Sequence, residues 1–478
     1  MPIILWTDAL VFVLIACAVA AGRYVSRREY LLASWRRVGE SRAGMAALTV
    51  LAAFVLVGLL DSLHYRPRLE AVAGKPATGY STEVRSALDM LLLPLRAGTE
   101  KTYSAPLATH LYARETVELP DGTQARVFPR LKHGGAHLKE PEEDWARDVA
   151  ARTLLGLVLA VLAGLTFAAV AVQAAARHWG VPWQAAWRRI WRGETHFAWN
   201  AVLATLAGLL LLVGPVVALA GGYHVFGTDK VGQDVLYLTL KSIRTGLVIG
   251  TITTLAMLPF AVALGIVAGY LGGWLNDVIQ YRYTTLNSIR GVLLIAAAVL
   301  MMQVVIDTHP EWFATAAQRA DARLLALCFI LGVTSWTGLC RLLRAETLKL
   351  RELEYVQAAQ AFGASSARIM GRHILPNVMH IVLIAVVMDF SGLVLAEAVL
   401  SYIGIGVDPS TISFGTMINT ARLELAREPI VWWSLVAAFV FMFVLVLAAN
   451  LFSDAVRDAF DPRLVGRQIV TSTQGQTA

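Results

Sequence analysis

Long apolar stretches alternate with short polar ones along most of the chain. A helix that crosses about 30 Å of hydrocarbon needs about 20 mostly apolar residues, and the chain contains nine windows of this kind. They lie at about 4–21, 44–61, 151–174, 199–220, 243–270, 287–306, 323–344, 377–402 and 430–453. This pattern predicts an all-α polytopic membrane protein with about nine transmembrane helices.

The composition agrees with this prediction. Hydrophobic residues make up 57% of the 478 residues and charged residues 16%, and the mean hydropathy is +0.59. These values exclude an ordinary soluble domain. The first window has no basic residues before its apolar run, unlike a secretory signal peptide. We therefore expect a retained span whose N-terminus lies outside.

Arginines cluster in short loops and predict the orientation of the chain. The loop from Arg23 to Gly44 contains six of them, and the loop 175–198 contains four. Basic residues in short loops stay in the cytoplasm. With nine spans, the tail bearing Arg457, Arg463 and Arg467 then falls on the same side. The net charge of +7 is explained by this topology and predicts no nucleic-acid partner.

The chain divides into five expected segments. These are two N-terminal spans (1–61), an extracytoplasmic insertion (62–150), a third span followed by an interfacial helix (151–198), a core of six spans (199–465) and a cytoplasmic tail (466–478). The insertion is predicted to be a small α+β cap. Its segment Glu115–Phe128 alternates around Pro120-Asp121-Gly122 as a hairpin does, and Glu83–Leu95 has the pattern of an amphipathic helix.

Polar turn residues precede the fifth span in "FGTDKVGQDVL", which we call the outer motif (Phe226–Leu236). Glycines favour tight turns, and Asp or Thr can cap a following helix. We expect an amphipathic re-entry helix on the outer leaflet that begins near Asp234. The residues that carry this motif are Gly227, Thr228, Asp229, Gly232 and Asp234.

A helix-forming segment between the seventh and eighth spans predicts a docking element in the 346–376 loop. Good helix formers run over 348–362, Gly363 then allows a bend, and a second helical piece covers 365–373. Small side chains let another surface approach the helix backbone closely. The candidate docking residues are Glu354, Gln357, Ala358, Ala359, Gly363, Leu375 and Pro376.

This loop resembles the cytoplasmic loop of permease subunits of ATP-binding-cassette importers. That pattern is Glu-Ala-Ala, three residues, Gly, nine residues, then Ile-x-Leu-Pro, and here Gln357 stands in place of its Glu and His373 in place of its Ile. Further resemblance to C-type permeases of the dipeptide, oligopeptide and nickel branch covers roughly 200–465. The segments that carry it are "FGTDKVGQDVL", "AGYLGGWLNDV", "SYIGIGVDPSTISFGTMI" and "NLFSDAVRDAFDPRL". Gln233 stands where that family usually has Arg.

The resemblance implies a type I importer permease core formed by the last six spans, in a bacterial inner membrane. It implies a B-type permease partner, two ATPase subunits on the cytoplasmic side and an extracytoplasmic solute-binding protein. The chain has no Gly-x-x-x-x-Gly-Lys-Ser/Thr stretch to hold ATP phosphates. We therefore expect a transporter subunit without enzyme activity or cofactor of its own, whose partners bind ATP and whose cargo is peptides or similar small solutes.

An ion-coupled secondary transporter or channel is the alternative. Acidic residues within spans commonly mark ion or substrate paths, and Asp389 and Glu397 lie about two turns apart in one apolar window. They are candidates for the translocation path, and Asp61 is a weaker one. No pair of broken, inverted spans supports this alternative. The histidines show no metal-ligand spacing.

Four tryptophans recur at every fourth position after the third span. Trp179, Trp183, Trp187 and Trp191 stand beside Arg188 and other arginines. Aromatic and basic residues in this pattern predict an amphipathic helix that lies in the lipid interface.

Overall fold

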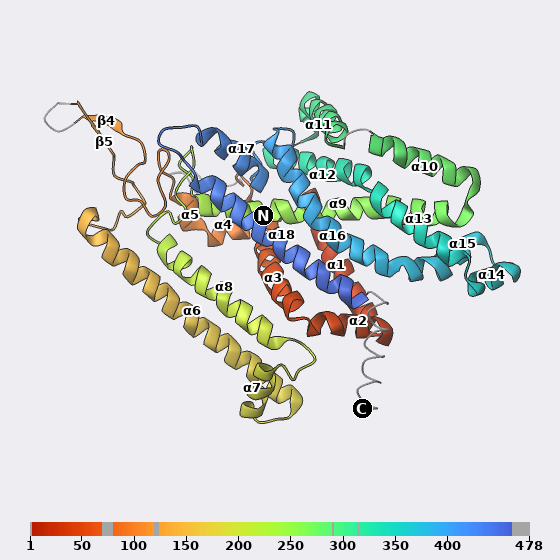
Figure 1. Cartoon of the computed structure of the whole chain (residues 1–478). Coiled ribbons are helices and arrows are strands. Elements are labelled where there is room, and N and C mark those ends of the chain that lie inside the picture. Colours follow the sequence, from red (N-terminus) through yellow and green to blue (C-terminus); the bar gives the residue numbers. More distant parts are fainter. Residues whose placement is uncertain (1, 69–79, 119–123, 289–290, 314, 461–478) are drawn as a thin grey trace. The chain divides into compact units, whose positions relative to one another are not determined.

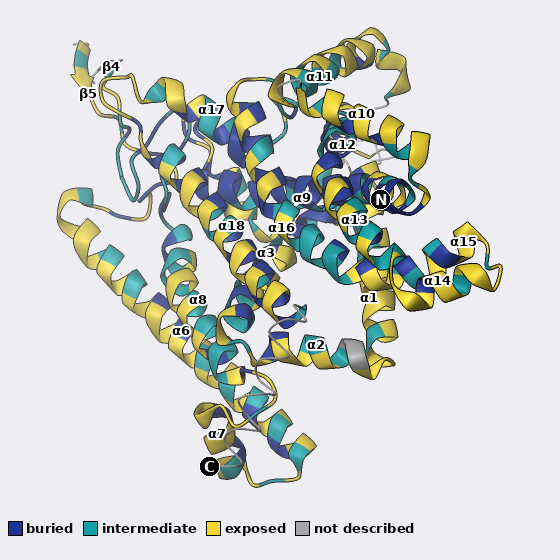
Figure 2. Ribbon diagram, turned by 45° about the vertical axis from the view of Figure 1, so that its right-hand side comes forward, coloured by how far each residue is buried: buried dark blue, intermediate teal, exposed yellow. Residues whose placement is uncertain are grey.

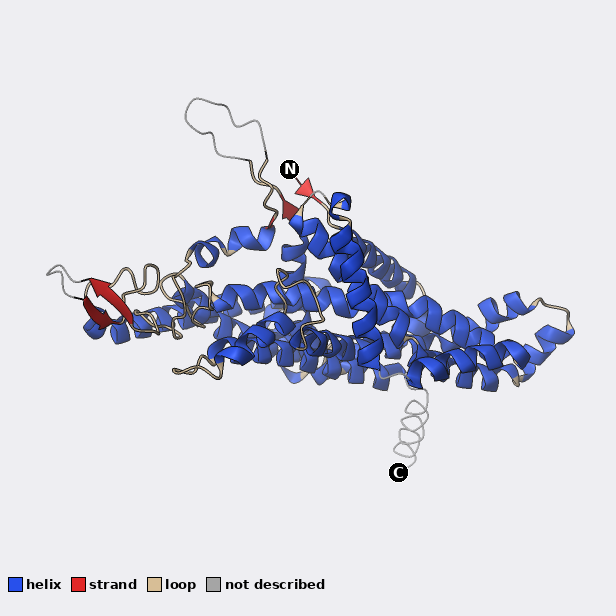
Figure 3. Cartoon of the chain, turned by 90° about the horizontal axis from the view of Figure 1, so that it is seen from above, coloured by secondary structure: helices blue, strands red, loops and turns tan. Residues whose placement is uncertain are grey.

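The structure, a computed structural model, describes residues 2–68, 80–118, 124–288, 291–313 and 315–460. The chain forms two compact units. Unit 1 comprises Met1–Ile4, Trp35–Thr245 and Ile412–Phe452, and unit 2 comprises Leu5–Ser34, Gly246–Thr411 and Ser453–Ala478. Helices predominate throughout, and the strands belong to the N-terminus and the insertion (Figure 3).

Within these residues, nine helical segments are long and apolar enough to span a bilayer, which confirms the prediction from hydropathy. They are α1 (Trp6–Ser26), α3 (Arg42–Ser62), α6 (Pro141–Trp179), α8 (Trp199–Ala220), α9 (Val235–Leu271), α11 (Gly291–Thr308), α12 (Ala316–Ser335) continued by α13 (Thr337–Arg351), α15 (Ser366–Ile369) continued by α16 (Leu375–Tyr402), and α18 (Trp433–Phe460). The protein is therefore a polytopic helical membrane protein (Figure 1).

Shorter elements connect these spans. The helices are α2 (Glu29–Glu40), α4 (Ala87–Leu91), α5 (Leu93–Ala97), α7 (Trp183–Arg192), α10 (Gly273–Ser288), the 3-10 turn Pro310–Trp312, α14 (Glu354–Ala361) and α17 (Phe414–Glu424). The strands are β1 (Pro2–Ile3), β2 (His64–Tyr65), β3 (Arg85–Ser86), β4 (Glu115–Glu118) and β5 (Gln124–Val127). Strands β1, β2 and β3 form one antiparallel sheet, and β4 pairs with β5.

Unit 1 contains an antiparallel helix pair, α6 and α8 (Figure 1). The helices touch through glycine: a Cβ added to Gly156 would lie 2.6 Å from the carbonyl oxygen of Gly214. Such close backbone contact between small residues is a common way to pair helices in lipid, where apolar burial gives no driving force. Most large apolar side chains of α6 are exposed, as expected for a helix that faces lipid (Figure 2).

The insertion differs in part from the predicted cap. The hairpin is confirmed, because β4 pairs with β5 in register Glu115 to Val127, while its turn at 120–122 lies outside the described residues. The single helix expected over Glu83–Leu95 is wrong. Ser86 pairs in a sheet and caps α4, and Pro94 then opens a separate helix, α5, so the segment divides into three short elements.

The expected re-entry helix at the outer motif is also wrong as a separate element. Helix α9 begins at Val235, as the cap at Asp234 predicts, but it continues without interruption to Leu271. The segment that was expected to lie on the leaflet is therefore the first part of a long span.

Unit 2 has two apolar cores. One joins α9, α13, α14 and α16 around Leu343, Val356 and Val378, each fully buried. The other joins α9, α12 and α16 around Ile249, Leu331 and Leu400. At the start of α1, the backbone amide of Thr7 donates a hydrogen bond of 3.2 Å to Asp321 of α12. Because the first core contains side chains of both α13 and α16, the helices before and after the 346–376 loop pack against each other.

The predicted orientation can be tested with single cysteines at two exposed positions, Gln124 in β5 and Ser365 before α15. A membrane-impermeant thiol reagent should label the Gln124→Cys variant in intact cells and the Ser365→Cys variant only after permeabilisation, because the charge pattern places them on opposite sides. The unmodified protein, with its three native cysteines, is the control. Labelling of both variants from outside would show that the orientation is wrong.

Candidate functional site

Buried aliphatic side chains pack the 346–376 loop against the helices that precede and follow it. Val356 of α14, Ile369 of α15 and Ile374 of the following π-helical turn have no exposed surface. They pack in one core with Leu343 of α13 and Val378 of α16. Helix α14 therefore packs directly against both neighbouring spans, so a displacement of α14 would press on both of them.

The opposite side of α14 is exposed (Figure 2). Glu354, Gln357 and Ala358 lie on it, and Phe362 exposes 91% of its surface. Aromatic side chains are enriched at protein–protein interfaces relative to the rest of the surface. Ala359, in contrast, is half-buried and packs against the core of unit 2. The accessible small residue of the motif is therefore Ala358.

Gly363 turns the chain between α14 and α15. Its φ is +77°, and an added Cβ would meet nothing within 4 Å, so backbone conformation rather than space requires glycine here. The amide of Gly363 donates to the carbonyl of Gln360 at 3.0 Å, and that of Ala364 to Ala359 at 3.1 Å. These two bonds form a Schellman end for α14.

A π-helical turn, Met370–Ile374, joins α15 to α16. Asn377 fixes this joint, because its Nδ2 donates to the carbonyl of His373 at 2.6 Å and to the hydroxyl of Tyr355 at 3.1 Å. Leu375 and Pro376 open α16, with Leu375 half-buried and Pro376 exposed. A π turn inside a helix often marks a functional position. The helix predicted over 348–362 is in fact interrupted at Glu352 and Leu353, where α13 gives way to α14.

The two acidic residues of α16 have different surroundings. Glu397 exposes only 1% of its surface and accepts a hydrogen bond of 2.7 Å from the hydroxyl of Ser401. Asp389 is half-buried. Eight residues at about 1.5 Å each separate them by about 12 Å along the helix axis. Their role in a translocation path stays a prediction.

The outer motif is a docking surface for the insertion. Gly227 and Gly232 have φ of +70° and +78°. Their missing side chains also matter, because a Cβ on Gly232 would overlap the backbone of Glu100 and one on Gly227 that of Ser104. Thr228 is fully buried and its hydroxyl accepts a hydrogen bond of 2.6 Å from the amide of Ser104.

Both aspartates of the motif order its backbone. Asp229 accepts hydrogen bonds from the amides of Val231 at 2.9 Å and Gln233 at 2.8 Å, which closes the turn. Asp234 accepts from the amide of Leu236 at 2.8 Å and so caps α9. The side chain of Gln233, where the family usually has Arg, is exposed.

A buried histidine lies between two carboxylates where the insertion meets the outer motif. His224 exposes 4% of its surface, and its Nδ1 lies 2.7 Å from Asp234. Its Nε2 lies 3.6 Å from Glu100 of the insertion. Glu100 also accepts hydrogen bonds from the amides of Lys132, His133 and Gly134. This arrangement joins two parts of the insertion to the start of α9.

The charges in this group support one another. Burial alone would lower the pKa of His224, but its interactions with Asp234 and Glu100 raise that pKa to about 9. Burial would raise the pKa of Glu100, but His224 and the three backbone amides lower it to about 2. At neutral pH the group therefore holds an imidazolium between two carboxylates, which satisfies charges that have left water.

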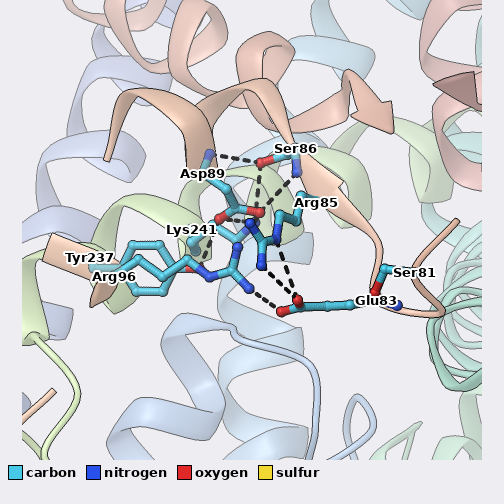
Figure 4. Close-up of polar contacts among 8 residues, drawn as sticks. All are labelled: Ser81, Glu83, Arg85, Ser86, Asp89, Arg96, Tyr237 and Lys241. Carbon is cyan, nitrogen blue, oxygen red and sulfur yellow. Dashed lines mark hydrogen bonds and ion pairs between the residues drawn. The ribbon is translucent and has the colours of Figure 1, made fainter. Parts of the chain in front are cut away.

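A second buried group lies between α3, the insertion and α9, and Figure 4 shows its members from the insertion and α9. Lys241 Nζ lies 2.7 Å from Asp61 and 3.1 Å from Asp89. The hydroxyl of Ser86 donates to Asp61 at 2.6 Å, and that of Tyr237 donates to Asp89 at 2.8 Å. Asp61 was a candidate for an ion path, and the structure places it in this ion pair.

An exposed group borders the second one. Arg85 contacts Glu83 at 3.0 Å, and Arg96 also forms an ion pair with Glu83 (Figure 4). Exposed ion pairs of this kind contribute little to stability. All three residues belong to the insertion, so this group does not tie it to the spans, whereas the two buried groups do.

Several residues of these sites were not found from the sequence, and His224, Lys241, Glu100 and Phe362 show why. His224 stands just before the outer motif, and Lys241 lies nearly two turns into a span, where a cation should have suggested an acidic partner. Glu100 gave no signal, because the backbone amides that surround it come from a distant part of the insertion. Phe362 was read only as a helix former, although an aromatic residue before a turn glycine can project from the surface.

The chain was compared with known proteins. Residues 261–466 match the family described as "Binding-protein-dependent transport system inner membrane component". The oligopeptide transport system permease protein OppC of Mycobacterium tuberculosis is 31% identical over 282 residues, which cover 55% of this chain and 90% of that protein. The glutathione transport system permease protein GsiD of Pectobacterium atrosepticum is 27% identical, with 59% and 92% covered.

Removal of the positive charge at Lys241 tests the second buried group. Lys241→Met should lower the free energy of unfolding by about 3–5 kcal/mol, because it leaves Asp61 and Asp89 buried without their cation. Lys230→Met, at an exposed lysine of the outer motif, is the matched control and should have almost no effect. Thermal unfolding of the purified protein measures both. Equal losses for the two variants would show that the ion pairs do not hold the insertion.

The first buried group predicts a pH dependence. The pKa of His224 is raised, so its stabilisation is complete below its usual pKa of 6.5 and is lost as the pH rises through about 9. The midpoint of thermal unfolding should fall over this window, whereas His224→Gln should remove this part of the fall. His309→Gln, in another loop, should keep the full dependence. An unchanged pH profile for His224→Gln would contradict the assignment.

Proposed function

Because the chain belongs to the family of binding-protein-dependent inner-membrane permeases, we propose that it is the C-type permease subunit of an ATP-binding-cassette importer for peptides or similar small solutes. Relatives named for oligopeptide, dipeptide and glutathione transport support this choice of cargo. The chain is an integral protein of the bacterial inner membrane.

The 346–376 loop carries the proposal that ATP hydrolysis is coupled to transport here. Its exposed side presents Ala358 and Phe362, and its buried side is packed against the spans before and after it. An ATPase subunit would seat α14 in a groove, with Phe362 as the aromatic anchor. Gly363 sets the angle at which this anchor leaves the helix.

The packing of unit 2 suggests how movement would pass from the ATPase to the outer ends of the spans. A displacement of α14 would move α13 and α16, because Val356 and Ile374 lock them into one core. At the far ends of these helices, Arg323 of α12 forms ion pairs with Asp307 and Asp408. Alternating access would break and remake contacts of this kind as the outer end opens and closes.

The remaining partners follow from the same family. A B-type permease would complete the pore, two ATPase subunits would bind on the cytoplasmic side, and a solute-binding protein would deliver cargo outside. The exposed apolar surface of α11, with Leu293, Met301 and Val304 each more than half exposed, would face lipid or the second permease. Asp389 and Glu397 are candidates for the path. An ion-driven transporter, the alternative, would leave the exposed Phe362 unexplained.

Two substitutions in the 346–376 loop test the coupling role. Ala358→Trp should prevent ATPase docking by steric overlap, and Gly363→Val should misdirect Phe362, because a β-branched side chain resists a φ of +77°. Each variant should reduce ATP-dependent uptake by about tenfold or more, equivalent to about 1.4 kcal/mol of lost binding. Co-purification of the ATPase subunit and uptake into vesicles provide the measurements.

The matched control is Thr285→Trp, which introduces the same side chain at an exposed position of α10. It should insert, bind the ATPase subunit and support uptake like the unmodified chain. Normal ATPase recovery and uptake for Ala358→Trp would refute the docking role of α14 and favour the ion-driven alternative.

A further inference from the structure

A cavity of about 680 Å³ lies among α6, α7 and α8 in unit 1. Its volume falls in the range of about 300–1,000 Å³ that is typical of small-molecule sites. The two spans touch at Gly156 and Gly214, and nearer their other ends both line this cavity, with α7 beside them (Figure 1). The predicted topology puts this end on the cytoplasmic side of the membrane.

One wall of the cavity is apolar and smooth. Ala171, Ala174 and Ala175 of α6 line it together with Leu203 of α8 and Ile190 of α7, and Ala171 and Ala175 pack against the core that contains those two side chains. None of the three alanines projects beyond its Cβ, so an unbranched hydrocarbon chain can lie along the helix. The wall belongs to spans that the membrane surrounds, so lipid acyl chains have direct access to it.

The other end of the cavity is polar. Arg189 of α7 lines it together with His178, Thr195 and His196. A second cavity of about 430 Å³ shares Thr195 and His196 with the first and is lined by Arg42 as well. An apolar chamber that adjoins a polar one fits a molecule with a hydrocarbon chain at one end and a charged group at the other.

The charges around the polar end favour an anion. Residues 175–198 contain four arginines against one glutamate. That glutamate, Glu194, lines both cavities and lies 3.9 Å from Arg192. The second cavity has one further acid, Glu40. Within the described part of the chain Arg189 has no carboxylate partner, and a guanidinium binds phosphate oxygens through two parallel hydrogen bonds.

We propose that this cavity binds one anionic phospholipid of the inner leaflet, with its phosphate on Arg189 and an acyl chain along the alanine wall. The stacked rings of Trp183, Trp187 and Trp191 hold α7 at the depth of the headgroups, with ring centroids 6.0 and 5.7 Å apart. The lipid would then fix α7 against α6 and α8. This inference stands apart from the transport function proposed above.

Native mass spectrometry of the purified full chain with added phosphatidylglycerol tests the proposal. One molecule should be retained, and Arg189→Gln should weaken its binding by about tenfold, as loss of one charge-assisted contact predicts. Ala174→Phe, which fills the apolar wall at an exposed position outside the helix core, should also abolish retention without a large change in thermal unfolding. Arg188→Gln removes a neighbouring charge that does not line the cavity and should change binding by less than about twofold.

Two further ligands distinguish a phospholipid headgroup from free phosphate. Phosphatidylethanolamine, which has no net charge, should bind at least about tenfold more weakly, and inorganic phosphate should not displace phosphatidylglycerol. Equal losses for Arg188→Gln and Arg189→Gln would show a general surface attraction and overturn the site. Unchanged retention in Ala174→Phe would overturn the acyl-chain wall, and displacement by inorganic phosphate would show a simple anion site instead.

Discussion

In hydrocarbon, a backbone amide or carbonyl without a partner costs several kcal/mol, so each span must remain helical while it crosses the membrane. The rest of this structure follows from that constraint. Departures from α-helix that bear on function lie at span ends: the positive-φ glycines of the outer motif, Gly363, and the π turn before α16. Function has to be built from these ends, because the spans themselves allow little variation in backbone geometry.

Buried charged side chains also need partners. The insertion and α9 are joined by Lys241 with two aspartates and by His224 with two carboxylates. His224 and the four acids are buried, and the side chain of Lys241 exposes only 15% of its surface. An unpaired member of such a group would be costly. The outer motif therefore has a structural task in this chain: its glycines let the backbone of the insertion approach, and its aspartates shape the turn and cap α9.

Much of the fold could be predicted from the sequence, because each membrane span is a run of about 20 mostly apolar residues that is easy to recognise. Nine hydropathy windows correspond to the nine candidate membrane helices in the described residues, and the cap at Asp234 marked the start of α9. Contacts between distant segments could not be predicted. Nothing local in the sequence places Glu100 beside His224, or shows that Ala359 packs inward while Ala358 remains exposed. The division of Glu83–Leu95 into three elements depends on the pairing of Ser86 with β2, which is again a long-range contact.

The central claim is that ATP energy enters the permease through the exposed side of α14. Phe362 is the most exposed large apolar residue there, and a cysteine at this position can be cross-linked to a partner in membranes. The account predicts that Phe362→Cys forms a cross-link to the ATPase subunit whose yield changes when ATP is bound. A cross-link should not form from a cysteine at Gln124, on the opposite predicted side. Absence of any cross-link from position 362, in a complex that still transports, would contradict the account.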